Sequence, residues 1–118
     1  MLLDKLKALE CSLHGEKRHD RNWLEQRLHP DFCEITRSGI SVNRAETLAS
    51  LVQERVAPII ISDDFQLITT TECSAILHYR TFESNGAKAS LRASCWVRSS
   101  EDVWTLIFHQ GTPAAGSA

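Results

Sequence analysis

The second half of the chain consists of strand-like segments joined by short turns, and this feature constrains the fold more than any other. The segments are rich in β-branched and aromatic residues, and they span residues 59–61, 65–71, 73–82, 89–98 and 103–110. Turn sequences at 84–87 and 99–102 separate the last three segments. Consecutive strands with such short connections predict an antiparallel meander.

The first third of the chain has a helical pattern instead. Leucines recur at the spacing of one buried helix face, at Leu2, Leu3, Leu6, Leu9 and Leu13. Charged residues 14–21 interrupt this pattern, and a second apolar stripe runs from Trp23 to Leu28. Pro30 ends it, because the residue before a proline avoids the helical region. Helices followed by strands predict an α+β fold with the helices on one face of a curved antiparallel sheet.

The segment between these two parts contains a short strand, a turn and a helix. Residues 31–36 alternate as a strand does, and residues 37–39 form a turn. Asn43 can cap a helix, with Glu46 in the position that completes a capping box. The pattern predicts that this helix runs to about Arg55 and that Pro58 ends any continuation.

Length and charge exclude several classes of protein. The 118 residues fit one domain, which we assign to residues 1–113, with an Ala/Gly/Ser tail at 114–118 expected to fray. The net charge of -2 and the lack of a basic block argue against nucleic acid or an anionic membrane as a partner. No signal peptide or apolar run of membrane-spanning length is present, so we expect a cytoplasmic protein.

The cysteines do not suggest a metal or a disulfide framework. Cys11, Cys33, Cys73 and Cys95 are far apart, without the paired spacing of a zinc site, and we expect free thiols. The sequence also has no phosphate loop, nucleophile elbow or dinucleotide fingerprint. We therefore predict no metal and no cofactor.

Alternation along the strands predicts two different sheet faces. A loop of three or five residues after Glu83 keeps the small apolar side chains of both strands together, including Leu77 and the only tyrosine, Tyr79; a two-residue turn would mix the patterns. The other face then mixes large apolar and polar groups and is the better candidate for a pocket. The residues predicted there are Ile76, His78, Arg80, Phe82, Arg92, Ser94, Trp96, Trp104, Leu106, Phe108 and Gln110. On the last strand, His109 is predicted to face away.

Helices in so short a chain can cover only one face of the sheet. The second face carries too much apolar surface for exposure to solvent. A second copy of the same sheet would cover it, which predicts a homodimer.

Several motifs resemble those of the nuclear-transport-factor-2-like superfamily, near its SnoaL-like and ketosteroid-isomerase-like members and its small bacterial domains of unknown function. They are the segments 28–32 (LHPDF), 37–39 (RSG), 92–96 (RASCW) and 104–113 (WTLIFHQGTP). The resemblance covers nearly the whole chain. It implies a cystatin-like cone with a pocket, commonly in a homodimer. Enzymes of the superfamily generally use a Tyr/Asp or Asp/His set, so the predicted position of Tyr79 argues against a ketosteroid-isomerase mechanism here.

Three functions are compatible with this pattern. The first is binding of a small apolar, carboxylate or carbonyl ligand by Trp23, Phe32, Glu34, Arg92, Ser94, Trp96, Phe108 and Gln110. The second is a cofactor-independent isomerase, cyclase or dehydratase, with Glu34 or His78 moving a proton. The third is a protein-interaction module, either stress-related or toxin-neutralising. We expect Glu34 to point into the cone and to form an ion pair with Arg92, because an unpaired buried carboxylate is costly.

Overall fold

The helical N-terminal third is confirmed. The structure, a computed structural model, describes residues 1–55 and 59–116. Helix α1 (Leu2–Ser12) is followed by a 3-10 helix, η1 (Glu16–His19), and by α2 (Arg21–Arg27). The side chain of Asp20 caps α2 by accepting a hydrogen bond from the Trp23 backbone N–H at 3.1 Å. The chain leaves the helix at Leu28, close to the boundary predicted from Pro30.

The middle segment folds as β1 (Leu28–Ile35), β2 (Ser41–Asn43) and α3 (Arg44–Gln53). Asn43 and Glu46 form the predicted capping box, in which each side chain accepts a hydrogen bond from the other residue's backbone N–H. The turn between the two strands needs a left-handed residue, which Gly39 supplies with φ of 89°. Strand β2 was not predicted. The prediction that Pro58 ends the helix concerns a residue outside the described ranges.

Four long strands follow, namely β3 (Ile60–Thr71), β4 (Ser74–Glu83), β5 (Ser90–Arg98) and β6 (Trp104–Pro113). Strand β3 joins two segments that we had predicted as separate, and its pairing with β4 shifts at Asp64, whose φ is 56°. Strand β6 continues past the predicted stop at Gly111 to Pro113. In the predicted tail, the Ala114 N–H still donates to the Ala89 carbonyl, and residues 117–118 lie outside the described residues.

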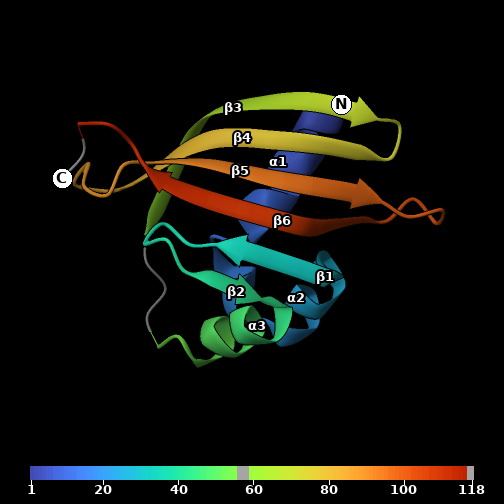
Figure 1. The fold of residues 1–118 in the computed structure, drawn as a ribbon, viewed down its shortest axis with the longest axis horizontal. Helices are drawn as coiled ribbons and strands as arrows, with labels where there is room; N and C mark the ends of the chain where they lie inside the picture. The colour runs from blue at the N-terminus through green and yellow to red at the C-terminus, as the bar shows by residue number, and fades with distance from the viewer. Residues whose placement is uncertain (56–58, 117–118) are drawn as a thin grey trace.

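The strands form one sheet in the order β2-β1-β6-β5-β4-β3. Figure 1 shows α1 crossing behind the curved strands β3–β6, while α2 and α3 lie beside β1 and β2. This arrangement confirms the predicted α+β cone. All neighbouring strands are antiparallel except β1 and β6, which run parallel and bring Glu34 next to His109.

The core fills the part of the cone between α1, α2 and the concave face of the sheet. Leu6 and Leu24 are completely buried there, and burial of one such leucine contributes about 1.5–3 kcal/mol. The other buried apolar residues are Leu13, Leu28, Phe32, Leu48, Ala75, Leu77, Tyr79, Trp96, Trp104 and Leu106.

The register between β4 and β5 differs from our prediction. Leu77 pairs with Ser94 and Tyr79 pairs with Arg92, so these residues share the concave face. This is the pattern of a two-residue turn, which we had rejected in order to keep the small apolar side chains of both strands on one face. The physical reason is a concave face that is itself mixed, because a buried polar cluster and a cavity replace part of the apolar core.

A bulge in β6 overturns a second prediction. Cys95 pairs with Phe108, whereas the next residue of β5, Trp96, pairs with Leu106. Ile107 is therefore an extra residue, and it reverses the alternation of all residues after it. As a result His109, which we had placed on the far face, points inward.

Candidate functional site

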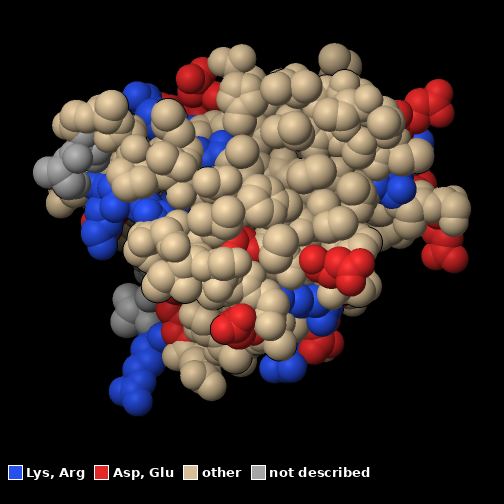
Figure 2. All heavy atoms as spheres, viewed as in Figure 1, with Lys and Arg blue, Asp and Glu red and all other residues tan. Residues whose placement is uncertain are grey.

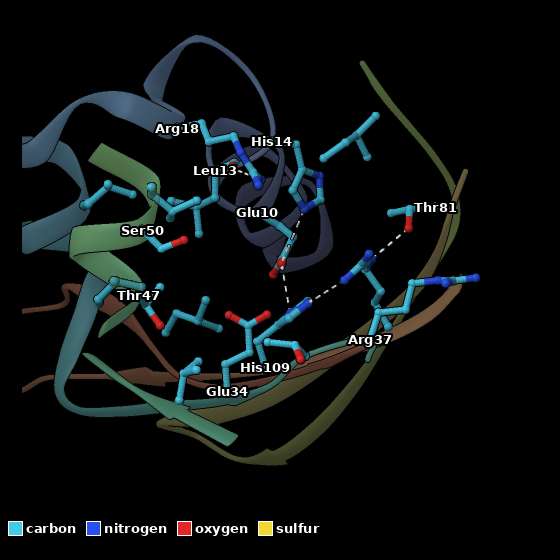
Figure 3. Close-up of a pocket in the computed structure, with 18 of the residues that line it drawn as sticks. Glu10, Leu13, His14, Arg18, Glu34, Arg37, Thr47, Ser50, Thr81 and His109 are labelled. Carbon is cyan, nitrogen blue, oxygen red and sulfur yellow. Dashed lines mark hydrogen bonds and ion pairs between the residues drawn. The ribbon is translucent and has the colours of Figure 1, made fainter. Parts of the chain in front are cut away.

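A cavity of about 440 Å³ opens between the concave face of the sheet and the helices α1 and α3. Its apolar wall includes Leu13, Leu24, Leu28, Phe32, Val42, Leu51, Ile60, Phe82 and Leu106. Its polar wall includes Glu10, His14, Arg18, Glu34, Arg37, Thr47, Ser50, Thr81, Arg92 and His109. In Figure 3 the labelled members of this polar set surround one open space.

Glu10 lies at the inner end of the cavity and is 1 % exposed. Its carboxylate accepts hydrogen bonds from the Tyr79 hydroxyl at 2.6 Å, from the Ser94 hydroxyl at 2.9 Å and from the Trp96 indole at 2.9 Å. Burial raises the pKa of Glu10, while these hydrogen bonds and the charge of Arg92 oppose the rise. The surrounding donors allow a buried carboxylate in a position where it would otherwise be too costly.

Two histidines stand beside this carboxylate. His109 Nδ1 lies 2.7 Å from the Ser94 hydroxyl, and His14 Nε2 lies 3.1 Å from the Tyr79 hydroxyl. Burial, followed by the charge of Arg92 and the neighbouring His14, lowers the pKa of His109 to about 3. Burial, together with Arg92 and Arg18, lowers the pKa of His14 to about 4. Both imidazoles are therefore neutral at neutral pH.

Arg92 faces the cavity with neutral partners. Its Nε donates to the Thr81 hydroxyl at 2.7 Å, and its Nη1 lies 3.4 Å from His109 Nε2. No carboxylate of a described residue lies within ion-pair distance of it. Gly111 provides the room, because a Cβ at this position would lie 2.6 Å from Arg92 Nη1. The guanidinium is thus held in place but not neutralised.

Glu34 points into the cavity, as predicted, beside His109. The predicted ion pair with Arg92 is absent, and no described residue donates a hydrogen bond to the Glu34 carboxylate. Burial raises the pKa of Glu34, and the charges of Arg92 and Arg18 oppose the rise only from a distance. The bonds of Arg92 to Thr81 and His109 hold it away from the carboxylate.

Arg18 and Arg37 complete the charged wall with different partners. Arg18 forms a two-fold ion pair with Glu54, with N–O distances of 2.7 and 3.1 Å. Arg37 instead donates to neutral groups, the Ser90 hydroxyl at 2.7 Å and the Ala89 carbonyl at 3.5 Å. Arg37 therefore resembles Arg92 in facing the cavity without a carboxylate among the described residues.

Of the residues predicted to bind a ligand, Phe32, Glu34 and Arg92 line the cavity. Ser94 and Trp96 are buried behind its wall, where both hydrogen-bond to Glu10. Whether any of these residues binds a ligand stays a prediction.

The predicted placement of four other residues is wrong. Phe108 and Gln110 lie on the outer face because of the bulge at Ile107. His78, which pairs with Ala93, also lies on that face. Trp23 lies beside the core, where its indole donates to the Ser12 hydroxyl at 2.8 Å, and it does not line the cavity.

The sequence contained one unused signal for the residues that we missed. Glu10 occupies a position of the α1 stripe between Leu6 and Leu13, where an apolar residue would be expected. A charged residue on a buried helix face needs partners, and His14 one turn later shares that face. Tyr79 was placed on the wrong side only because of the register error.

The described residues show no group of three or more His, Cys, Asp or Glu side chains that could hold a metal ion. None of the described helices combines the length and apolarity required to cross a membrane.

Solved structures with this architecture are numerous, although no protein-family model matches the sequence and a search of curated proteins finds no match. A nuclear-transport-factor-2-like protein from Cytophaga hutchinsonii superposes with a TM-score of 0.77 at 18% identity, over 96% of this chain and 95% of that one. A protein from Parabacteroides distasonis, described provisionally as a ketosteroid isomerase, gives 0.73 at 10% identity, over 94% and 86%. A protein from Exiguobacterium sibiricum, described provisionally as a Ca/calmodulin-dependent kinase II association domain, gives 0.65 at 20% identity, over 95% and 92%. The chain therefore has the nuclear-transport-factor-2-like fold.

Proposed function

We propose that the protein binds a small organic carboxylate in the cavity, with Arg92 as the group that binds the anion. The observation that carries the proposal is the environment of Arg92, whose partners Thr81 and His109 are both neutral. A planar guanidinium presents paired donors that match a carboxylate. Since it is held in place before a ligand arrives, little side-chain freedom is lost on binding.

The shape of the cavity supports the same proposal. Its volume of about 440 Å³ lies within the range of small-molecule sites, roughly 300–1,000 Å³. Leu28, Phe32 and Leu106 provide an apolar wall for the body of the ligand. An open cone of this size argues against the protein-interaction alternative, which calls for a cone filled with side chains.

Calorimetric titration with a panel of aliphatic, keto and aromatic monocarboxylates, each paired with its primary amide, tests the proposal. We expect at least one acid to bind more tightly than its amide. In Arg92→Gln the binding should weaken about 10–100-fold, the range for loss of a charge-assisted hydrogen bond. The control is Arg80→Gln, which removes an exposed arginine paired with Asp63. Equal binding of acids and amides, or an unchanged affinity in Arg92→Gln, would contradict the proposal.

A second candidate is a cofactor-independent enzyme that moves a proton on carbon. It is favoured by the Glu34 carboxylate, which faces the cavity without a hydrogen bond from a described residue and has a raised pKa. A general base must be within reach of the ligand and must not be committed to an ion pair, and Glu34 meets both conditions. The provisional description of the Parabacteroides distasonis protein agrees with this class of chemistry.

Deuterium incorporation separates this candidate from simple binding. Keto acids that bind are incubated with the protein in D₂O, and exchange at the carbon next to the carbonyl is followed by proton NMR. We expect accelerated exchange that Glu34→Gln abolishes while binding is retained. No acceleration by the unmodified protein would leave binding as the function.

We also propose a homodimer through the outer face of the sheet and a cytoplasmic location. Figure 2 shows a broad uncharged surface over the middle of β3–β6, with most charged side chains toward the periphery. Ile68 and Leu91 on that face are 49% and 56% exposed. A second copy of the same sheet would cover this surface, and the association-domain description of the Exiguobacterium sibiricum protein agrees with assembly.

A further inference from the structure

The cluster below the cavity contains a chain of hydrogen bonds that ends on a buried acid. It runs from Arg92 through His109 and Ser94 to Glu10, over contacts of 3.4, 2.7 and 2.9 Å. Arg92, His109 and Glu10 line the cavity, whereas Ser94, which joins His109 to Glu10, is 1 % exposed and does not line it. Neither carboxylate binding nor a Glu34 base requires this arrangement.

The direction of each hydrogen bond follows from the partners. Arg92 has only donors, so His109 Nε2 must accept and carries no proton. The proton of the neutral imidazole is then on Nδ1, which donates to the Ser94 oxygen. The Ser94 hydroxyl proton is consequently free to donate to Glu10 Oε2. The Glu10 carboxylate accepts further hydrogen bonds from the Tyr79 hydroxyl and the Trp96 indole, and this set of donors favours its ionised form.

We propose that His109, Ser94 and Glu10 form a proton relay, in which Glu10 is the final acceptor of a proton taken from a bound ligand at His109 Nε2. The ligand's acidic C–H or O–H bond breaks, and its proton bonds to Nε2. The Nδ1 proton moves to the Ser94 oxygen, and the Ser94 hydroxyl proton moves to Glu10 Oε2. One proton leaves the ligand and one carboxylic acid forms. His109 and Ser94 keep their number of protons, and His109 changes tautomer.

The charges around the relay suit these roles. His109 faces Arg92 on β5, Glu34 on β1, Glu10 on α1 and His14 in the turn after α1. Burial, followed by the charge of Arg92 and the neighbouring His14, lowers the pKa of His109, which disfavours a second proton on its ring. His109 therefore passes a proton on and does not retain it. Burial raises the pKa of Glu10, so Glu10 is the better final acceptor of the proton.

A second route from Glu10 runs through Tyr79 to His14, and the geometry favours the first. The contact between Tyr79 and His14 is 3.1 Å, against 2.7 Å between Ser94 and His109. The contact of Arg92 with His109 Nε2 is longer than the two contacts within the relay, so this is where water or a ligand can enter. A ligand whose carboxylate is bound to Arg92 would then hold its acidic C–H or O–H bond near Nε2. This last step rests on the proposed function.

NMR of ligand-free protein with ¹⁵N-labelled histidine tests the relay directly, because it distinguishes the two tautomers of each ring. We expect the Nδ1–H form of His109 at neutral pH. On acidification we expect a change to the Nε2–H form at the pH where infrared spectroscopy detects protonation of Glu10. A His109 that is Nε2–H at neutral pH, or a tautomer change at His14 instead, would overturn the proposal.

A matched pair of variants isolates the Ser94 hydroxyl. Ser94→Thr keeps the hydroxyl, whereas Ser94→Val has nearly the same shape as threonine without it. The tautomer change should persist in the first and disappear in the second. Glu10→Gln, which cannot be protonated, should also abolish it, and persistence in Ser94→Val or Glu10→Gln would contradict the relay. Since no ligand is used, failure here leaves carboxylate binding standing, and failure of carboxylate binding leaves the relay standing.

Discussion

Glu34 and His109 are direct neighbours on the parallel strands β1 and β6, and both point into the cavity. One is a carboxylate whose pKa is raised by burial, and the other is an imidazole whose pKa is lowered to about 3 by burial, Arg92 and His14. Opposite shifts on adjacent groups are typical of sites that move protons. The relationship depends on the parallel pairing, which joins two distant parts of the sequence.

Glu34→Gln should stabilise the fold at neutral pH. Burial raises the pKa of Glu34 in the folded protein above that in the unfolded chain. Ionisation of such a carboxyl lowers the free energy of unfolding once the pH exceeds the pKa of the group in the unfolded chain. The amide has no such charge to bury. Urea unfolding at neutral pH should therefore give a larger free energy of unfolding for the variant. The difference should shrink as the pH falls through the pKa of Glu34 in the folded protein, and a destabilised variant would imply a partner for Glu34.

Tyr79→Phe should destabilise the protein by about 1–3 kcal/mol, the range for a buried hydrogen bond to a charged group. The variant keeps the ring that stacks on Phe65 but leaves Glu10 with one donor fewer. Urea unfolding measures the effect. Thr69→Val, which removes an exposed hydroxyl of β3 that makes no hydrogen bond with a described residue, is the control and should change little. A loss as small as in the control would show that Glu10 does not need this donor.

Gly111→Ala should weaken the binding of a carboxylate without unfolding the protein. The added Cβ would lie 2.6 Å from Arg92 Nη1, so the guanidinium must move away from its place at the cavity wall. We expect about a tenfold loss of affinity by calorimetry. At Gly15 a Cβ would meet its nearest neighbour at 3.7 Å, so Gly15→Ala is the matched control. Unchanged affinity in Gly111→Ala would mean that the position of Arg92 is not important.

His109 should make stability fall in mild acid. Its pKa is about 3 in the folded protein, against an ordinary value of 6.5, so between these values the unfolded chain binds the extra proton. Stability gained from the neutral ring is complete above about pH 6.5 and declines as the pH falls toward 3. Unfolding of wild type and His109→Gln over this range should show a shallower decline in the variant. Parallel curves would contradict the low pKa.

Leu91→Glu should shift the protein from dimer to monomer. Leu91 is 56% exposed on the outer face of β5, where a charge would be buried at the proposed interface. Light scattering after size exclusion measures the mass. Ile40→Glu is the control, since Ile40 is 59% exposed in the turn between β1 and β2. A monomeric wild type, or a variant that stays dimeric, would contradict the proposed interface.

Local patterns in the sequence predicted most helices and strands, whereas the pairing between strands was harder to predict. The leucine stripe of α1 and the capping box of Asn43 depend on residues a few positions apart, so spacing alone reveals them. The β4–β5 register depends on what fills the cone, and our requirement that the small apolar side chains of both strands share one face placed the side chains of β4 on the wrong sides. The position of Glu34 was predicted, but its lack of an ion pair depends on how Thr81 and His109 hold Arg92.

The bulge at Ile107 makes the pairing of β6 as important as its composition. If Ile107 took a place in the regular ladder opposite Cys95, Phe108 and Gln110 would turn toward the interior and His109 would lie on the opposite side. The same chemical groups would then be present with their roles exchanged. Related chains are therefore better compared by whether they keep this bulge than by whether they retain a histidine near the end of the strand.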